Sequence, residues 1–141
     1  NDYRIEYSVR NFNIEEAKAL VDSDPRKLSV GEMYKVAGTY QKGSAEYNHV
    51  MEVAANTYPY IVAAAVNQSA LLIADKKYDE ALQLLGRSDQ NDARILTAQG
   101  YAYAGKGDVN KARAAWEKAA AKGSSDAKHN LAELDKYINS L

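Results

Sequence analysis

The chain begins with a short run in which apolar and polar residues alternate. Residues 3–9 read YRIEYSV, with an apolar side chain at every second position. A period of two predicts a β-strand that has one apolar face. A single strand is not stable alone, and no second strand pattern is evident along the chain. We therefore expect residues 1–12 either to be the end of an upstream domain or to pair with a second copy of the chain.

After residue 12 the apolar residues recur at the spacing of an α-helix. Asn13 with Glu16, and Ser29 with Glu32, have the spacing of a capping box at a helix start. Pro25, Pro59 and short polar turns separate the segments. Short turns between helices of this length favour an all-α fold of stacked antiparallel hairpins. The predicted helices cover about residues 13–24, 29–40, 44–58, 60–74, 78–85, 92–104, 110–121 and 126–140.

Two of the predicted hairpins repeat one pattern of small and large residues, 31 residues apart. A small residue and a large one on the first helix are followed by small, large and small residues on the second. Small side chains let two helices approach closely, and large ones fill the gaps between them. The spacing therefore indicates packing rather than chemistry. The aligned pairs are Gly100 with Ser69, Tyr103 with Leu72, Ala112 with Ala81, Trp116 with Leu85, and Ala119 with Ser88.

This pattern resembles the signature of the tetratricopeptide repeat, whose usual length is 34 residues. The second copy follows the signature closely but has Ser124 where the family usually has proline. The resemblance implies an all-α, helix-hairpin α-solenoid over residues 13–141, and the alternating pattern of residues 3–9 predicts a short N-terminal β-strand before it. We expect an atypical repeat at 29–59, further repeats at 60–91 and 92–125, and a capping helix at 126–140 with Leu131, Leu134, Tyr137 and Ile138 facing inward.

The first third of the chain resembles a second group of proteins. The stretches YRIEYSVRNFNIEEAKAL, LSVGEMYKVAGTY and GSAEYNHVMEVA are similar to the C-terminal part of certain Gram-negative cell-envelope proteins. In that group an outer-membrane-protein-A-like segment precedes a tetratricopeptide tail. The proteins are associated with fimbria-type loci, and their molecular role is largely unassigned. The resemblance implies an extracytoplasmic location, in the periplasm or cell envelope.

Composition excludes several functional classes. The net charge of −1 gives no overall basic field for binding nucleic acid. No apolar run reaches the roughly 20 residues that a membrane-spanning helix needs, so we expect no direct membrane span. The absence of cysteine excludes disulfides, zinc–thiolate sites and cysteine nucleophiles.

The candidate chemical motifs have simpler structural explanations. His49 and Glu52 lie on one helical face, but a metal site needs a third ligand, and no other histidine or cysteine lies nearby in the sequence. The turn at residues 105–108, GKGD, lacks the Gly-Lys-Ser/Thr sequence of a phosphate-binding loop. No nucleophile-elbow pattern is present. We therefore expect no enzymatic activity, no cofactor and no metal.

The tetratricopeptide resemblance also implies where a partner would bind. Family members use a concave face, lined by the first helix of each repeat, for peptides or partner proteins. Family members that bind chaperones hold a C-terminal carboxylate with lysine and asparagine; here the matching positions read Val66, Ala70, Thr97 and Tyr101, so that clamp is absent. The predicted groove residues are Glu32, Val36, Val66, Ala70, Ile73, Arg94, Thr97, Tyr101 and Lys128.

We therefore predict a non-catalytic module that binds a peptide or protein partner in this groove, with Tyr101 as the main aromatic anchor. The alternative is a structural domain whose partner is its own upstream domain or a second copy of the chain, through a homodimer formed by residues 3–9. In that case the groove is short, is partly filled by the N-terminal segment, and binds nothing in isolation.

Overall fold

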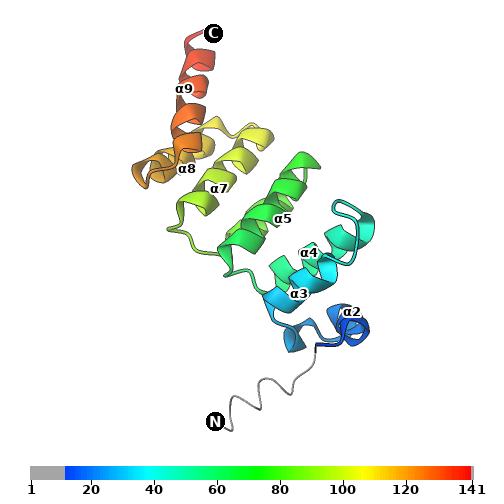
Figure 1. Cartoon of the computed structure of the whole chain (residues 1–141). Coiled ribbons are helices and arrows are strands. Elements are labelled where there is room, and N and C mark those ends of the chain that lie inside the picture. Colours follow the sequence, from blue (N-terminus) through cyan, green and yellow to red (C-terminus); the bar gives the residue numbers. More distant parts are fainter. Residues whose placement is uncertain (1–11, 141) are drawn as a thin grey trace, which may run out of the picture. The chain divides into compact units, whose positions relative to one another are not determined.

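The computed structural model describes residues 12–140, which form eight α-helices and one short 3-10 helix and contain no β-strand (Figure 1). The predicted all-helical fold is confirmed for these residues. The predicted strand at residues 3–9 lies outside them. The chain divides into two compact units, Asn1–Thr57 and Tyr58–Leu141.

Unit 1 contains α2 (Ile14–Ser23), η1 (Pro25–Lys27), α3 (Val30–Ala37) and α4 (Ala45–Thr57). Asn13 caps α2, because its side-chain oxygen accepts hydrogen bonds from the backbone N–H groups of Glu15 and Glu16. Ser29 and Glu32 form the full capping box that the sequence predicts at the start of α3. The capping signals in the sequence therefore mark both helix starts correctly.

Helix α3 packs against both α2 and α4. Its side chains Met33 and Val36 are fully buried. On the surface, His49 Nε2 of α4 lies 2.6 Å from Asp22 Oδ1 of α2. The partner of His49 is therefore this carboxylate on a neighbouring helix, and not Glu52 on its own helix.

Unit 2 contains five helices: α5 (Val62–Ala74), α6 (Tyr78–Leu85), α7 (Ala93–Lys106), α8 (Val109–Ala121) and α9 (Ser125–Asn139). Their ends lie within about two residues of the predicted ends. Helix α5 pairs with α6, and α7 pairs with α8. Helix α7 also packs against α5 and α6, and α9 packs against α8. The two hairpins are therefore stacked, and the first helix of one lies beside the first helix of the next.

The stacking of α7 on α8 depends on one glycine and one tryptophan. A Cβ atom placed on Gly100 would lie 2.1 Å from Nε1 of Trp116, so only glycine leaves room for the indole ring. Trp116 is 6% exposed, and its Nε1–H donates a hydrogen bond to the carbonyl oxygen of Thr97 at 3.1 Å. The equivalent residues of the first hairpin, Ser69 and Leu85, are fully buried. These positions pack as the repeat pattern predicts.

The glycines of the GKGD turn have separate roles. Gly105 lies inside α7, where a Cβ atom would collide with the ring of Tyr78. Gly107 follows α7 with a φ of +86°, the left-handed conformation that glycine adopts without steric cost. Lys76 has a φ of +62° in the matching turn after α5. The two turns thus share one backbone conformation, although only one has glycine at the left-handed position.

Helix α9 buries only part of its predicted inner face. Ala127 is fully buried, and Leu131 and Leu134 are partly buried against the cluster that contains Trp116. By contrast, Tyr137 is 60% exposed and Ile138 is 38% exposed. The prediction that Tyr137 and Ile138 face inward is therefore wrong, because within residues 12–140 the last turn of α9 leaves both side chains exposed. Over that same range, no helix combines the length and apolar character that crossing a membrane requires.

Candidate functional site

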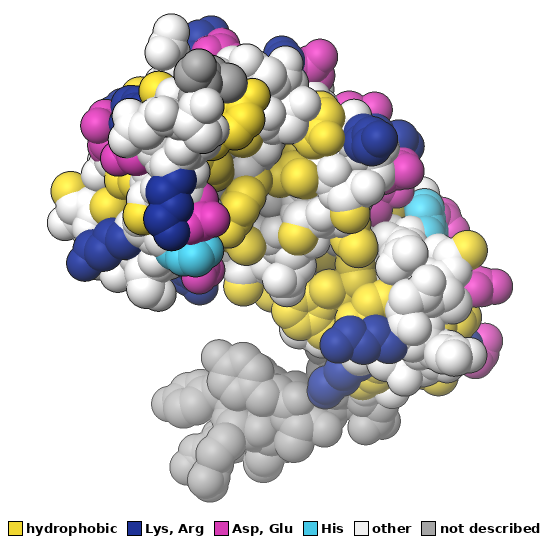
Figure 2. Space-filling view, turned by 90° about the horizontal axis from the view of Figure 1, so that it is seen from above, with side chains coloured by type: hydrophobic (Ala, Val, Ile, Leu, Met, Phe, Trp, Pro, Cys, Tyr) yellow, Lys and Arg dark blue, Asp and Glu magenta, His cyan; other side chains and the backbone are white. Residues whose placement is uncertain are grey.

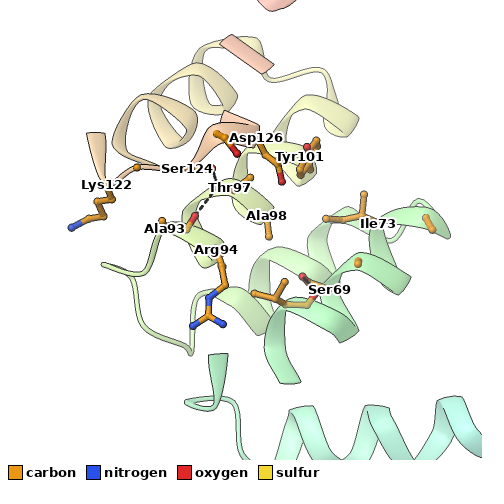
Figure 3. A pocket seen from close by; sticks show the side chains of 15 residues that line it. Ser69, Ile73, Ala93, Arg94, Thr97, Ala98, Tyr101, Lys122, Ser124 and Asp126 are labelled. Carbon is orange, nitrogen blue, oxygen red and sulfur yellow. Dashed lines mark hydrogen bonds between the residues drawn. The ribbon is translucent and has the colours of Figure 1, made fainter. Parts of the chain in front are cut away.

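An open pocket of about 650 Å³ lies between the first helices of the two hairpins in unit 2 (Figure 3). Helix α5 contributes one wall, and α7 contributes the other. The turn after α8 and the first residues of α9 close one end. The lining residues are Val66, Ser69, Ala70, Ile73 and Ala74; Ala93, Arg94, Thr97, Ala98 and Tyr101; and Lys122, Gly123, Ser124, Ser125 and Asp126.

Thr97 and Ser124 join α7 to the start of α9 within this pocket. The Thr97 hydroxyl donates its only proton to the carbonyl oxygen of Ala93 at 2.7 Å. The two hydroxyl oxygens lie 2.9 Å apart, so Ser124 must donate in the bond between them. Ser124 also caps α9 by accepting from the backbone N–H of Ala127. These bonds fix the end wall of the pocket and satisfy the hydroxyl groups of Thr97 and Ser124.

Tyr101 is the large aromatic side chain of the pocket and is 42% exposed. Its ring meets the indole of Trp116 edge to face, with 5.6 Å between the ring centroids. Such aromatic pairs are favourable beyond the area that they bury. Trp116 is in turn held by its hydrogen bond to Thr97. The ring of Tyr101 is therefore supported from beneath while one side stays open to solvent.

The pocket has an apolar wall and charged groups at its edge. Figure 3 shows the side chains of Arg94 and Lys122 pointing outward, while Ile73 extends from α5 toward α7. Arg94 forms hydrogen bonds of 3.2 Å with both carboxylate oxygens of Asp92. The hydrogen bond from the Arg94 side chain is the main cause that holds the pKa of Asp92 below its usual value. This ion pair offsets the positive charge of Arg94 at the edge of the pocket. The other two charged residues that line the pocket, Lys122 and Asp126, have opposite signs.

Six of the nine residues predicted for the groove line this one pocket: Val66, Ala70, Ile73, Arg94, Thr97 and Tyr101. The other three lie elsewhere. Val36 has no exposed surface in unit 1, so its side chain is not available to a ligand. The Glu32 carboxylate accepts a hydrogen bond from the backbone N–H of Ser29 as part of the α3 cap. Lys128 is exposed on α9 but does not line the pocket.

The sequence did not indicate the end wall, formed by residues 122–126. This wall depends on the hydrogen bond between Thr97 and Ser124, which are 27 residues apart. The one signal available was Ser124 itself, which stands where the repeat signature usually has proline. A serine there can both cap α9 and hydrogen-bond to Thr97 of α7, which proline cannot do.

Within the described residues, His49 and Lys106 of the candidate chemical motifs each have a structural partner. Within residues 12–140, no group of three or more His, Asp or Glu side chains is placed to hold a metal ion. In the GKGD turn, the Lys106 amino group bonds the carboxylate of Asp79 on α6, which raises the pKa of Lys106. That lysine thus has a structural partner. On the face shown in Figure 2, basic and acidic side chains are interspersed, without a continuous patch of one sign.

Stacked helix hairpins, with an open pocket between their first helices, define this chain as a helical-repeat protein. The family model of the Tetratricopeptide repeat-like domain matches residues 16–136, and the chain therefore belongs to that family. Domains of this family generally mediate protein–protein interaction and are generally non-catalytic. No curated protein and no solved structure matches this chain at a significant level.

Proposed function

We propose that this chain is a non-catalytic interaction module and that the pocket of unit 2 binds an extended segment of a protein partner. The observation that supports this most directly is the supported but open ring of Tyr101 beside the apolar side chains of α5. Rigid aromatic side chains next to apolar surface commonly contribute much of the affinity of an interface.

The shape of the pocket favours a segment of chain over a flat docking surface. Its two walls are the stretches of α5 from Val66 to Ala74 and of α7 from Ala93 to Tyr101, each about 12 Å long. The side chains of α5 that face it are small or of medium size: Val66, Ala70, Ile73 and Ala74. Side chains of a bound peptide can therefore enter between the helices, while its backbone contacts polar groups at the edge.

A pair of matched variants tests this proposal. An array of extended peptides with apolar residues at alternate positions supplies the ligand, and calorimetry with the full chain measures the Kd of the strongest binder. Ala70 on α5 and Ala114 on α8 are both exposed, but only Ala70 lines the pocket. We expect Ala70→Arg to weaken binding by at least about tenfold, and Ala114→Arg to leave the Kd unchanged.

Equal effects of the two variants, or an array without any binder, would overturn the proposal. Those results would favour the alternative, a structural domain whose partner is its own upstream domain or a second copy through residues 3–9. We also propose an extracytoplasmic location in the cell envelope, which rests on the sequence resemblance alone. Fractionation of cells that express the native gene tests it, and recovery of the protein in the cytosol would contradict it.

A further inference from the structure

The alternating pattern of residues 3–9 predicts a segment with one apolar face, which would need a surface to cover it. In an extended conformation, which the sequence pattern predicts, Tyr3, Ile5, Tyr7 and Val9 would share that face. Residues 12–140 contain no strand to which the segment could pair. Any surface in that part of the chain that covers its apolar face must therefore be helical.

The pocket of unit 2 matches the central part of such a segment in length and spacing. From Ile5 to Val9 an extended segment spans about 13 Å, close to the roughly 12 Å of α5 between Val66 and Ala74, the first and last of its residues that line the pocket. Alternate side chains of an extended segment are about 6.6 Å apart. Val66 and Ala70 are separated by four helical residues, or about 6 Å along α5. Successive apolar side chains of the segment can therefore contact successive turns of the helix.

The charged residues of the segment are also compatible with those at the edge of the pocket. Between its apolar residues the segment has Arg4 and Glu6, and Arg10 follows it. The edge of the pocket likewise has both signs, because Lys122 and Asp126 lie at one end. A segment with charges of one sign would meet repulsion at one of these side chains, whereas a segment with both signs can pair with each.

We propose that residues 3–9 of a second copy of this chain bind in the pocket of unit 2, beside Tyr101. This inference rests on the proposed function, since it names the segment that the pocket takes. In each chain, Phe12 lies below the amino group of Lys35, 5.3 Å from it, and Asn13 caps α2. The segment is therefore attached to unit 1 immediately after residue 11. The segment of a second copy can reach the pocket whatever the arrangement of the two units within one chain.

Photo-cross-linking between isotopically distinct copies tests the proposal. A chain labelled with nitrogen-15 carries p-benzoylphenylalanine in place of Tyr101 and is mixed with the unlabelled natural chain. After irradiation and trypsin digestion, we expect the labelled peptide of residues 95–106 to be joined to the unlabelled peptide of residues 5–10, IEYSVR. Leu71 is exposed on α5 and does not line the pocket, so the same cross-linker at position 71 is the control.

The expected yield of this mixed product is at least about tenfold higher from position 101 than from position 71. Equal yields from both positions, no product with residues 5–10, or products only within one labelled chain would overturn the inference. These failures are distinguishable from failure of the proposed function. If array peptides bind and Ala70→Arg blocks them, but no mixed product forms, the pocket binds peptides and residues 3–9 are not its ligand.

Discussion

Gly100 and Trp116 show how single residues set the distance between two helices. The indole ring occupies the space where any other residue at position 100 would place its Cβ atom. The same indole supports Tyr101 in the pocket. One small residue in the repeat pattern therefore determines both the packing of α7 on α8 and the position of the aromatic ring that we assign to binding.

We expect Gly100→Ala to lower the free energy of unfolding by about 1–3 kcal/mol, because the added methyl group overpacks the contact with Trp116. Alanine within a helix normally stabilises by about 0.5–1 kcal/mol relative to glycine, so the sign of the effect is diagnostic. Urea denaturation measures it. Gly31→Ala in α3 is the control, since its nearest contact is 3.8 Å away, and it should be neutral or stabilising. A stabilised Gly100→Ala variant would contradict this packing.

Lys76 gives a second prediction at the residue scale. Its φ of +62° is unfavourable for a residue with a Cβ atom, by about 1–2 kcal/mol. We expect Lys76→Gly to raise the free energy of unfolding by up to about 1 kcal/mol, after allowance for the greater freedom of glycine in the unfolded chain. Gly107→Lys should have the opposite effect in the matching turn. Thermal denaturation of both variants checks this, and shifts of the same sign would argue against a shared turn conformation.

At the scale of elements, the start of α7 depends on Asp92. Its carboxylate accepts a hydrogen bond from the backbone N–H of Arg94 and also binds the Arg94 side chain. The cap at this helix start is therefore strongest when Asp92 is ionised. Because α7 forms one wall of the pocket, this cap also supports the candidate site.

The pKa of Asp92 is lower in the folded chain than its ordinary value, chiefly because of the side-chain hydrogen bond from Arg94. A lowered folded pKa contributes stability that is present above the unfolded pKa, about 3.9, and is lost as the pH falls through the folded pKa. We expect Asp92→Asn to keep the cap but to reduce the loss of stability as the pH falls below about 4. Asp92→Ala should cost about 1 kcal/mol at neutral pH. Unfolding curves at acidic and neutral pH check both predictions. If Asp92→Asn loses as much stability at acidic pH as the natural chain does, the lowered pKa of Asp92 does not contribute to stability.

The last helix tests the difference between packed and exposed apolar residues. Leu134 is partly buried against the cluster around Trp116, whereas Tyr137 is 60% exposed. We expect Leu134→Ala to lower the free energy of unfolding by about 1–2 kcal/mol, below the value for a fully buried leucine. Tyr137→Ala should change it by less than about 0.5 kcal/mol. Chemical denaturation measures both, and a larger loss for Tyr137→Ala would mean that its ring is packed after all.

For the whole molecule, the sequence predicted the helices and their pairing well because both depend on local signals. Capping residues, turns and the small–large pattern of Gly100 and Trp116 each act within one hairpin. The candidate site was predicted in part. The helix walls follow from the repeat, but the end wall depends on Thr97 and Ser124, two hydroxyl groups far apart in the chain. Side-chain burial also escaped prediction, since the repeat pattern placed Val36 in the groove although it lies in the core of unit 1.

The central claim concerns the place where unit 2 binds a peptide, and nuclear magnetic resonance tests it most directly. Backbone amide shifts of the isotope-labelled full chain are recorded as the strongest peptide from the array is added. The account predicts that the largest changes cluster at Val66, Ala70, Ile73, Thr97 and Tyr101, which line one pocket. Largest changes in unit 1, or on α6 and α8 away from this pocket, would contradict it.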